Sequence, residues 1–390
     1  MKIVHCIRSL AATVGGPPMV VTRLVAMQRQ AGHDVQLVFE DPCQELVPLP
    51  AGLTENDLLM VPAPRVQDRL RDIPFQETVS AAFHEADLIH VHGIWGRVPY
   101  RAMRLAPTVG KPYVISPHGM LNTWALQQKP LRKKAALLAG VKQQVHAAQG
   151  IHALSEYEHD CVKSWGFQSS VVTIPNGVDL DDIDPLPAVG EFRQQYPQLN
   201  AGGIQRPFIL FLSRLHPGKR LDLLAEAFAK IADDFPELRL VVVGPDAGAQ
   251  QEFELRIDQL GCRDKLVMPG PLWGRDKFAA MVDAYCFCLP SDHESFSVAI
   301  VEALACSCPV VISEQCHFAQ VADVNAGLLA RLDSNHLAEQ LSQLICDPES
   351  TEKMRHNARR FVESEFQWEH IAQRLLRFYE TTLQRNAVTV

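Results

Sequence analysis

Two charged segments in the second half of the sequence have the spacing needed to hold a diphosphate and a sugar. In Ser213-Arg214-Leu215-His216-Pro217-Gly218-Lys219, directly after an apolar run, an arginine and a lysine stand five residues apart. Such a pair at a helix start can straddle a diphosphate, the guanidinium by a forked contact and the ammonium as a point charge. Glu294 and Glu302 stand eight residues apart around a predicted helix start, so one carboxylate can hold a sugar and the other a ribose diol. Backbone N–H groups at Phe296 to Val298 would meet phosphate oxygens there.

The first half carries a glycine pair and a loop histidine, each directly after a predicted strand. Gly15-Gly16 leads into a helix, where the backbone can approach an anion closely, although such a segment is more often only a turn. The sequence around it is not G-x-G-x-x-G, which disfavours a nicotinamide or flavin enzyme. His118 lies between Pro117 and Gly119 at a strand end, in a loop where its imidazole or its carbonyl can point toward a ligand.

Two sets of residues have the spacing of metal ligands. His90 and His92 form a His-x-His pair, but no third ligand is visible, and a strand end explains the pair equally well. Cys286-x-Cys288 and Cys306-x-Cys308 lie in or beside apolar runs, where a spacing of two places both thiols on one face of a strand. Core packing is the better interpretation of these thiols, and we predict no metal site and no cofactor.

Apolar runs that alternate with amphipathic segments predict a doubly wound, mainly parallel α/β sheet in each half of the chain. A chain of 390 residues is too long for one core, so we place one domain at residues 1–180 and a second at 205–367. The expected strands are Ile3–Ile7, Val35–Phe39, Leu88–Val91, Tyr113–Ile115, Ile151–Leu154, Val171–Ile174, Phe208–Leu212, Leu238–Val243, Leu266–Met268, Phe287–Leu289 and Pro309–Ile312, with helices at Met19–Ala31, Leu131–Ala148, Leu221–Ala232 and Trp368–Leu383.

Composition and charge exclude several classes of protein. The formal net charge of −8 argues against nucleic acid as the main partner. The first apolar run is broken by His5 and Arg8, too short to span a membrane and without a signal-peptide pattern, which favours a cytoplasmic protein. The ten cysteines have no secreted-domain spacing, so we expect mostly buried free thiols.

The motifs follow the order of a known family along nearly the whole chain. The sequence resembles retaining glycosyltransferase family 4, whose GT-B fold has two Rossmann-like domains with an interdomain cleft. The segments that carry this resemblance are Gly15-Gly16, Ser116-Pro117-His118-Gly119, Ile174-Pro175-Asn176-Gly177-Val178-Asp179, Ser213-Arg214 with Lys219, Val243-Gly244-Pro245, and Glu294-x7-Glu302. The last is the most specific of them.

The resemblance implies a role for each segment. Arg214 and Lys219 would bind the donor diphosphate, Glu294 the transferred sugar and Glu302 the ribose, with His118 near the anomeric carbon. The last helix, about residues 368–390, would pack back on the first domain. We expect donor contacts from Gly15, Gly16, Ser213, Gly244, Gly270, Leu272, Glu294, Ser295, Phe296, Ser297, Val298 and Glu302, and acceptor-side contacts from His92, Trp95 and Asn176. Two features depart from the family: Ser-Phe-Ser-Val follows Glu294 where many members have glycines, and two prolines follow Gly15-Gly16.

The function implied is retaining, metal-independent transfer of a sugar from a UDP or GDP sugar to a saccharide or lipid-linked acceptor, in polysaccharide or glycolipid assembly. A nucleotide-sugar 2-epimerase shares the fold, and product analysis with and without acceptor would separate the two. A sugar-binding protein without catalysis would be expected to carry a secretion signal and no cationic clamp. A nicotinamide-dependent dehydrogenase ranks third among the alternatives, because its fingerprint is missing.

A stretch without acidic residues runs from Arg97 to Ser155 and contains nine basic residues. Within it, Leu131 to Lys142 reads as an amphipathic helix with basic residues at its start. It is either a helix packed on its own sheet with solvated lysines, or a patch that rests on anionic lipid at the inner membrane face. In the second case the protein would be peripheral to the membrane and would act on a membrane-borne acceptor.

Overall fold

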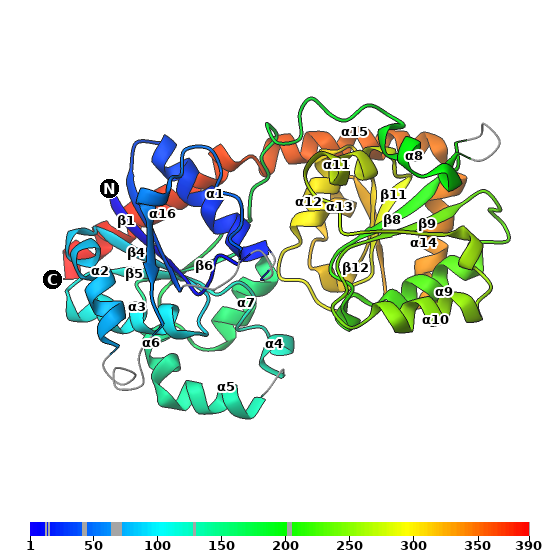
Figure 1. Cartoon of the computed structure of the whole chain (residues 1–390). Coiled ribbons are helices and arrows are strands. Elements are labelled where there is room, and N and C mark those ends of the chain that lie inside the picture. Colours follow the sequence, from blue (N-terminus) through cyan, green and yellow to red (C-terminus); the bar gives the residue numbers. More distant parts are fainter. Residues whose placement is uncertain are drawn as a thin grey trace. The chain divides into compact units, whose positions relative to one another are not determined.

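The computed structural model describes residues 1–11, 14, 16–40, 45–63, 72–127, 130–200 and 205–389, and the chain divides into two compact units (Figure 1). The first unit joins Met1–Gly177 to Trp368–Val390, and the second is Val178–Gln367. The segment between the two predicted domains, 1–180 and 205–367, therefore belongs to the second unit, where it carries the short helix α8 (Glu191–Gln195).

The first unit is built on a seven-stranded parallel sheet in the order β3-β2-β1-β4-β5-β6-β7. The chain winds outward in both directions from β1 and β4, the arrangement of a doubly wound fold. Its central strands are short apolar runs because helices cover them on both faces. The strands are β1 (Lys2–Ile7), β2 (Asp34–Glu40), β3 (Leu58–Val61), β4 (Leu88–His92), β5 (Tyr113–Ser116), β6 (Gly150–Ala153) and β7 (Ser170–Thr173).

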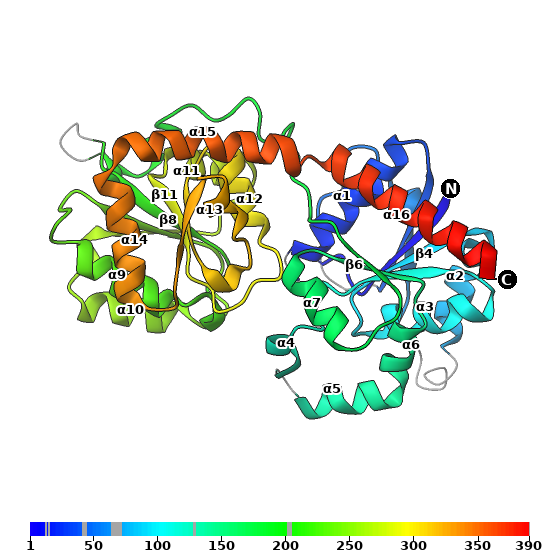
Figure 2. The same ribbon diagram turned by 180° about the vertical axis from the view of Figure 1, so that it is seen from behind.

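Two groups of helices cover this first sheet. The helices α1 and α16 pack against each other on one face (Figure 2), and α2, α3 and α6 lie together on the other. The final helix of the chain thus belongs to the first unit, although 190 residues of the second unit precede it. The helices are α1 (Gly16–Gln30), α2 (Ile73–Glu85), α3 (Arg97–Thr108), α4 (Thr123–Gln127), α5 (Pro130–Ala136), α6 (Lys142–His146), α7 (Glu156–Ser164) and α16 (Trp368–Thr389).

The second unit repeats the design with a six-stranded parallel sheet in the order β10-β9-β8-β11-β12-β13. The order reverses between β8 and β11. The strands are β8 (Phe208–Leu212), β9 (Arg239–Val243), β10 (Leu266–Gly270), β11 (Cys286–Leu289), β12 (Val310–Ser313) and β13 (Gly327–Ala330), and the helices besides α8 are α9 (Leu221–Ile231), α10 (Gln250–Gln259), α11 (Gly274–Asp283), α12 (Val298–Ala305), α13 (Gln320–Asp323), α14 (Ser334–Cys346) and α15 (Pro348–Glu365).

The structure differs from the sequence-based expectation in two strands and one helix. The strands β3 and β13 were not predicted, because they are four-residue strands at sheet edges and too short to show a period. The helix expected from Leu131 to Ala148 is interrupted, because Gly140 adopts a φ of 113° inside a π-helical turn (Leu137–Val141) between α5 and α6.

Candidate active site

A lysine and a glutamate meet where the strand order of the second sheet reverses. Lys219 follows β8 and Glu294 follows β11, which is its neighbour in the sheet. The Lys219 ammonium pairs with Glu294 Oε1, and the hydroxyl of buried Ser291 donates to the same oxygen over 2.6 Å. Only 16% of the lysine side chain and 11% of the glutamate side chain are exposed. Ligands of doubly wound sheets bind at such a reversal, so this pair marks the candidate site.

Backbone hydrogen bonds hold the two loops that carry this pair. The Asp292 N–H donates to the Gly218 carbonyl over 3.0 Å, and the Glu294 N–H donates to the Gln315 carbonyl over 3.0 Å. The side chain of Asp292 was not singled out from the sequence. Its Oδ1 is buried and has no hydrogen-bond partner among the described residues, and burial raises its pKa above the usual value.

The second predicted cation, Arg214, is not part of this pair. Its side chain is exposed, and the residues that the structure describes offer it no ion-pair partner, whereas Leu215 next to it is buried in the core. The structure therefore brings together one cation and one carboxylate of the predicted set. Among the described residues the arginine has no ion-pair partner.

Glu302 lies on α12 and pairs with a lysine that the sequence gave no reason to choose. Its Oε1 lies 2.7 Å from Nζ of Lys277 on α11, and both side chains are largely buried. Before the helix, Phe296 packs with Phe318 and Phe366, with ring centroids 6.2 Å away in each case. Since that side chain belongs to the core, the segment Ser295 to Val298 would offer a ligand its backbone N–H groups.

One serine and two glycines that were expected to bind the donor hold neighbouring loops close together. The Ser213 N–H donates to the Val243 carbonyl over 3.1 Å, and the Gly244 N–H donates to the Gly270 carbonyl over 3.2 Å. A Cβ on Gly244 would lie 1.9 Å from the Ser213 carbonyl oxygen, and the glycine has a φ of 144°. Glycine is required here by the close approach of two backbones, while Leu272 is half-buried against the core of the unit.

In the first unit His118 stands in a strained loop that a buried carboxylate holds. His118 and Gly119 both have positive φ, 51° and 75°. Glu158 is completely buried and accepts hydrogen bonds from the Gly119 and Leu154 N–H groups, the latter over 2.8 Å. Burial raises the pKa of Glu158 to about 7, against the effect of those two donors. The sequence did show Ser155-x-x-Glu158, but that pattern indicates a helix start rather than a support for a loop 39 residues away.

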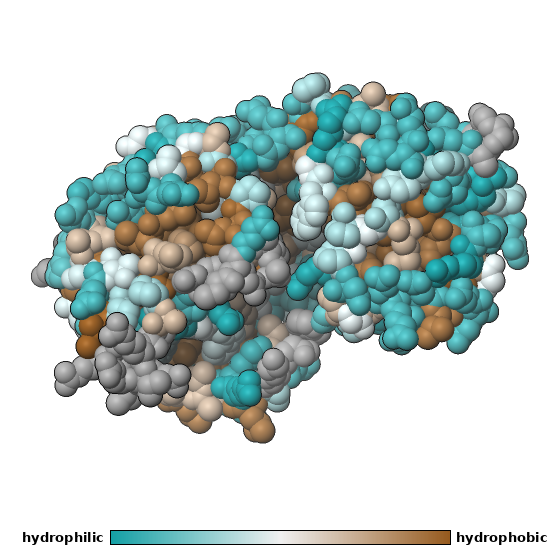
Figure 3. Space-filling model, in the orientation of Figure 1, coloured by the Kyte–Doolittle hydropathy of each residue, from teal (hydrophilic) through white to brown (hydrophobic). Residues whose placement is uncertain are grey.

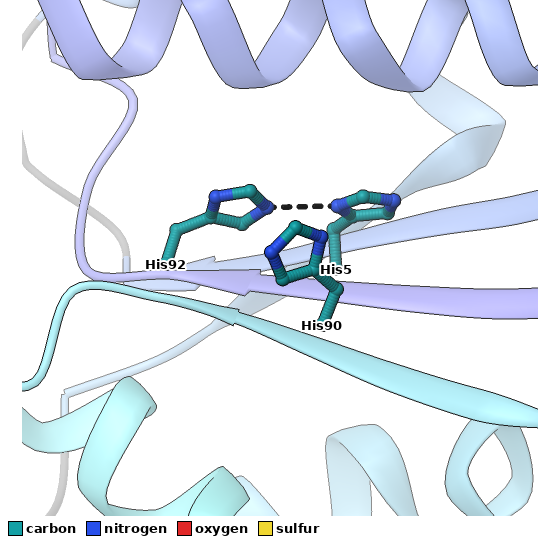
Figure 4. Close-up of side chains that lie close together, drawn as sticks. All are labelled: His5, His90 and His92. Carbon is teal, nitrogen blue, oxygen red and sulfur yellow. Dashed lines mark hydrogen bonds between the residues drawn. The ribbon is translucent and has the colours of Figure 1, made fainter. Parts of the chain in front are cut away.

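The His-x-His pair does have a third histidine beside it, contrary to the sequence analysis. His5 on β1 lies next to His90 and His92 on β4, and all three side chains are buried between the sheet and a helix (Figure 4). One nitrogen from each ring lies within 4.8 Å of the others, and these three form the one group of three or more possible ligand residues found among the described residues. The sequence had shown His5 only as an interruption of an apolar run.

The hydrogen bonds of these histidines fit a polar network better than a metal site. His5 bonds to His92 over 2.8 Å and to Gln28 over 2.8 Å, and His90 bonds to Tyr379 and Ser116. His92 also bonds to His118 over 3.0 Å. Both nitrogens of each of the three rings are therefore in use, so a metal ion would have to displace several of these bonds.

The remaining predicted residues are dispersed. Trp95 is half-buried under the Lys133 ammonium, 5.9 Å from its ring centroid, and its indole N–H has no partner among the described residues. Asn176 is buried, and Gly16 begins α1 and is exposed. Gly15 lies outside the described residues. The predicted pairs of cysteines, Cys286, Cys288, Cys306 and Cys308, are all buried in the core of the second unit.

The basic stretch is partly neutralised within the first unit. Asp72, outside the stretch in sequence, is buried and pairs with Arg97 over 2.6 Å and with Arg101 over 3.1 Å. These guanidinium groups hold the pKa of Asp72 below its usual value even though burial opposes the shift. Two of the nine basic residues thus form ion pairs with one carboxylate.

Models of two glycosyltransferase families together match most of the chain. The model described as Glycosyltransferase Family 4 matches residues 14–182, and the model described as Glycosyl transferases group 1 matches residues 197–361. The chain belongs to glycosyltransferase family 4. The expectation of a GT-B α/β fold with two Rossmann-like, doubly wound domains is confirmed.

Relatives of known name cover almost the whole chain. A GDP-mannose:cellobiosyl-diphosphopolyprenol alpha-mannosyltransferase from Xanthomonas oryzae pv. oryzae is 26% identical over 98% of this chain and 97% of its own length. A D-inositol 3-phosphate glycosyltransferase from Kribbella flavida is 30% identical over 71% of this chain and 67% of its own.

Solved structures share the fold at low identity. A sucrose-phosphate synthase from Thermosynechococcus elongatus has a TM-score of 0.79 and 20% identity, and covers 99% of this chain and 100% of its own. HepE from Anabaena, in complex with UDP and glucose, has a TM-score of 0.76 and 21% identity, and covers 97% of this chain and 99% of its own. None of the helices described here is both long enough and apolar enough to cross a bilayer.

Proposed function

We propose that this glycosyltransferase moves a sugar from a UDP or GDP sugar to a saccharide or lipid-linked acceptor, with retention at the anomeric carbon and without a metal ion, in polysaccharide or glycolipid assembly. The observation that carries the proposal is the Lys219–Glu294 pair at the reversal of the second sheet. The relatives support the substrate classes, since one is named for GDP-mannose and a diphosphopolyprenol acceptor and HepE is seen with UDP and glucose.

The pair suggests how a donor would be held. A diphosphate beside Lys219 would share the charge of the ammonium, and Glu294 could then accept hydrogen bonds from sugar hydroxyls. Transfer breaks the bond between the anomeric carbon and a phosphate oxygen, and Lys219 with the uncommitted Arg214 would stabilise the negative charge that develops on the leaving diphosphate. The acceptor hydroxyl would attack from the face that the diphosphate leaves, and its proton would pass to the phosphate.

The other predicted donor contacts fit the same frame. Glu302, which pairs with Lys277, would accept hydrogen bonds from the ribose, and the backbone N–H groups from Ser295 to Val298 would meet the phosphates. The glycine loops at Gly244 and Gly270 would give the nucleotide a smooth backbone surface. Charge on fixed cations would take the place of a divalent ion. The sequence contains two Asp-x-Asp triplets, at 179–181 and 182–184, but Asp184 of the second triplet pairs with Arg359.

The direct test is a transfer assay with UDP and GDP sugars and saccharide or lipid-linked acceptors, followed by determination of the anomeric configuration of the product. Glu294→Gln should lower turnover about a hundredfold or more, because the carboxylate would grip the sugar as charge develops. Glu252→Gln, an exposed position on α10, is the matched control and should be unaffected. Near-normal transfer by Glu294→Gln would contradict the proposal, and an epimerised nucleotide sugar formed without acceptor would replace it with epimerase activity.

A membrane-borne acceptor is supported by the surface of α5 and the π-helical turn after it. Leu131 and Leu138 are 82% and 89% exposed, and Arg132 and Lys134 are exposed beside them. The segment α5 lies at the lower edge of the first unit in Figure 1, and in the same orientation Figure 3 shows both hydrophobic and hydrophilic surface there. Lys133 is excluded from this surface because its ammonium donates to the Ala125 carbonyl. Exposed leucines beside cations suit the boundary between acyl chains and anionic headgroups.

Cosedimentation with vesicles of rising anionic lipid content would test this contact. The double variant Arg132→Ser, Lys134→Ser should bind more weakly than the wild type, with binding lost at high salt as the charges are screened. The matched control changes two exposed lysines elsewhere, Lys163 and Lys230, to serine. Equal binding by all three proteins, or none at low salt, would leave a soluble acceptor as the better account.

A further inference from the structure

We propose that a chain of hydrogen-bonded side chains inside the first unit fixes which nitrogen of His118 carries the proton, so that His118 presents an unprotonated Nδ1 to a hydroxyl group of the substrate. Tyr379 and Ser116 are positioning residues in this chain. The proposal rests on the proposed function only in the role that it gives to His118.

This hydrogen-bond chain consists of eight consecutive hydrogen bonds and starts at a backbone carbonyl. His152 bonds to the Ile174 carbonyl through Nε2 and to Ser116 through Nδ1, each over 2.7 Å. Ser116 bonds to His90 Nε2 over 2.7 Å, and His90 Nδ1 bonds to the Tyr379 hydroxyl over 2.5 Å. These groups come from β5, β6, β4 and α16, so the C-terminal helix supplies a link in the middle of the sheet.

The second half of this series of hydrogen bonds runs from Tyr379 on α16 through Gln28 on α1 to the loop of His118. Gln28 Nε2 lies 3.3 Å from the Tyr379 hydroxyl, and Gln28 Oε1 lies 2.8 Å from His5 Nε2. His5 Nδ1 bonds to His92 Nε2 over 2.8 Å, and His92 Nδ1 bonds to His118 Nε2 over 3.0 Å. Figure 4 shows the link between His5 and His92, with His90 beside it.

The direction of every bond follows from the first one, because a carbonyl can only accept. His152 must carry its proton on Nε2 to donate to Ile174, so its Nδ1 accepts from the Ser116 hydroxyl. The serine oxygen then accepts from His90 Nε2–H, and His90 Nδ1 accepts from the Tyr379 hydroxyl. The phenol oxygen can now only accept, which orients Gln28 with its amide N–H toward Tyr379 and its oxygen toward His5.

The same rule carries the direction to the end of the chain. His5 donates from Nε2 to the Gln28 oxygen, so its Nδ1 accepts from His92 Nε2–H. His92 Nδ1 in turn accepts from His118 Nε2–H. The proton of His118 is therefore on Nε2. Nδ1 keeps a lone pair, for which the described residues provide no hydrogen-bond donor, and His118 is half-exposed.

Each histidine must be neutral for this argument to hold, and burial ensures this. Desolvation lowers the pKa of His5 and His152 to about 4 and that of His118 to about 3. It also lowers the pKa of His90 and His92 well below the usual value, with neighbouring histidines adding to the shift. Reversing the direction of these hydrogen bonds would leave the Ile174 carbonyl facing the lone pair of His152 Nε2. This disfavours the other tautomer by roughly tenfold or more.

The chemical consequence is a specificity rule. Nδ1 of His118 can accept a hydrogen bond from a hydroxyl of the bound sugar or acceptor, but it cannot donate one to an ether or carbonyl oxygen. A substrate in which that hydroxyl is methylated would lose the contact, because no proton remains to be donated. The tautomer is set by a residue of α16 that lies 261 positions further along the sequence than His118, since Tyr379 is the group that orients the Gln28 amide.

Nitrogen-15 NMR of histidine-labelled protein tests the proposal directly, because protonated and unprotonated ring nitrogens resonate far apart. Wild-type His118 should show one tautomer, with the proton on Nε2. Tyr379→Phe removes the group that orients Gln28 and should give a mixture of tautomers at His5, His92 and His118. Tyr113→Phe is the matched control, since this buried tyrosine bonds to the Gln144 carbonyl outside the chain.

A second variant that interrupts the hydrogen-bond chain, together with a kinetic measurement, tests whether the tautomer of His118 matters for activity. Ser116→Ala removes the hydroxyl that links His90 to His152 and the Ile174 carbonyl, and it should give the same mixture of tautomers at His118. In both variants kcat/KM for the acceptor or donor should fall about two- to tenfold, as expected when the competent form drops to between a half and a tenth of the molecules. Tyr113→Phe should leave both readouts unchanged.

The outcomes distinguish this proposal from the proposed function. His118 protonated on Nδ1 in the wild type, or a tautomer unaffected by Tyr379→Phe and Ser116→Ala, would overturn the chain argument whether or not the protein transfers sugar. A tautomer mixture in both variants with unchanged kcat/KM would overturn the role of His118 in binding the substrate. Failure of sugar transfer by the wild type would leave the NMR test fully usable.

Discussion

The buried histidines predict a steep loss of stability in mild acid. His5, His90, His92 and His152 are each at most 4% exposed and are held neutral by burial, which lowers the pKa of each. In the unfolded chain these groups return to the ordinary pKa of 6.5. Between that value and the lower folded value the unfolded state binds more protons, so the free energy of unfolding falls as the pH is lowered.

The size of the effect follows from the same values. A histidine that stays neutral in the folded state while it titrates normally in the unfolded state destabilises by about 1.2 kcal/mol between pH 7 and 5.5. These four histidines together with His118, whose pKa burial lowers to about 3, therefore contribute about 6 kcal/mol. Glu158 acts in the opposite direction, because its folded pKa of about 7 lies above its ordinary 4.5. It is protonated first in the folded state and restores about 1.5 kcal/mol over the same interval. The net expected loss is about 4.5 kcal/mol, a large part of the 5 to 15 kcal/mol typical of a domain.

Urea unfolding at pH 7.0 and 5.5, followed by tryptophan fluorescence, would measure this loss. Four of the five tryptophans belong to the first unit, and the fifth, Trp273, is 73% exposed in the second, so the signal reports mainly on the unit that holds the histidines. His152→Gln should reduce the loss by about 1 kcal/mol, since it removes one titrating group. His84→Gln, at an exposed position on α2, is the control and should behave as the wild type. A free energy of unfolding that is unchanged or higher at pH 5.5 would contradict the prediction that these histidines are neutral in the folded state.

Three further predictions concern the second unit and the chemistry. Lys219→Ala should weaken UDP or GDP binding by about 1.5 to 3 kcal/mol, the range for a hydrogen bond to a charged group, as measured by calorimetry against the exposed control Lys230→Ala; an unchanged affinity would make the Lys219 loop a surface turn only. Gly244→Ala should destabilise the second unit by about 2 kcal/mol or more, because its Cβ would collide with the Ser213 carbonyl. Gly248→Ala, which has a positive φ but open space around it, should cost less, and equal melting temperatures for both variants would exclude the collision. Sugar transfer should survive EDTA, whereas complete loss that manganese restores would overturn the metal-independent mechanism.

The sequence alone determined the architecture and the local motifs. Alternating apolar runs predicted eleven of the thirteen strands, and each motif followed a strand because loops at the carboxyl ends of parallel strands carry the ligand-binding groups. The motif order identified the family, which the family models confirm. Local signals were weakest for short edge strands such as β3, and for the helix after Leu131, where the conformational freedom of Gly140 decided the outcome.

The tertiary structure decided which side chains work together. Lys219 meets Glu294 although 75 residues separate them, and Glu302 meets Lys277, which belongs to no motif. The histidine chain depends on contacts as distant as Gln28 with Tyr379, 351 residues apart. A periodic pattern along the chain records only which face of an element is buried. The partner that a buried polar group finds on that face depends on how strands and helices are ordered in space, and this is why His5 could be read from the sequence only as an interruption of a strand.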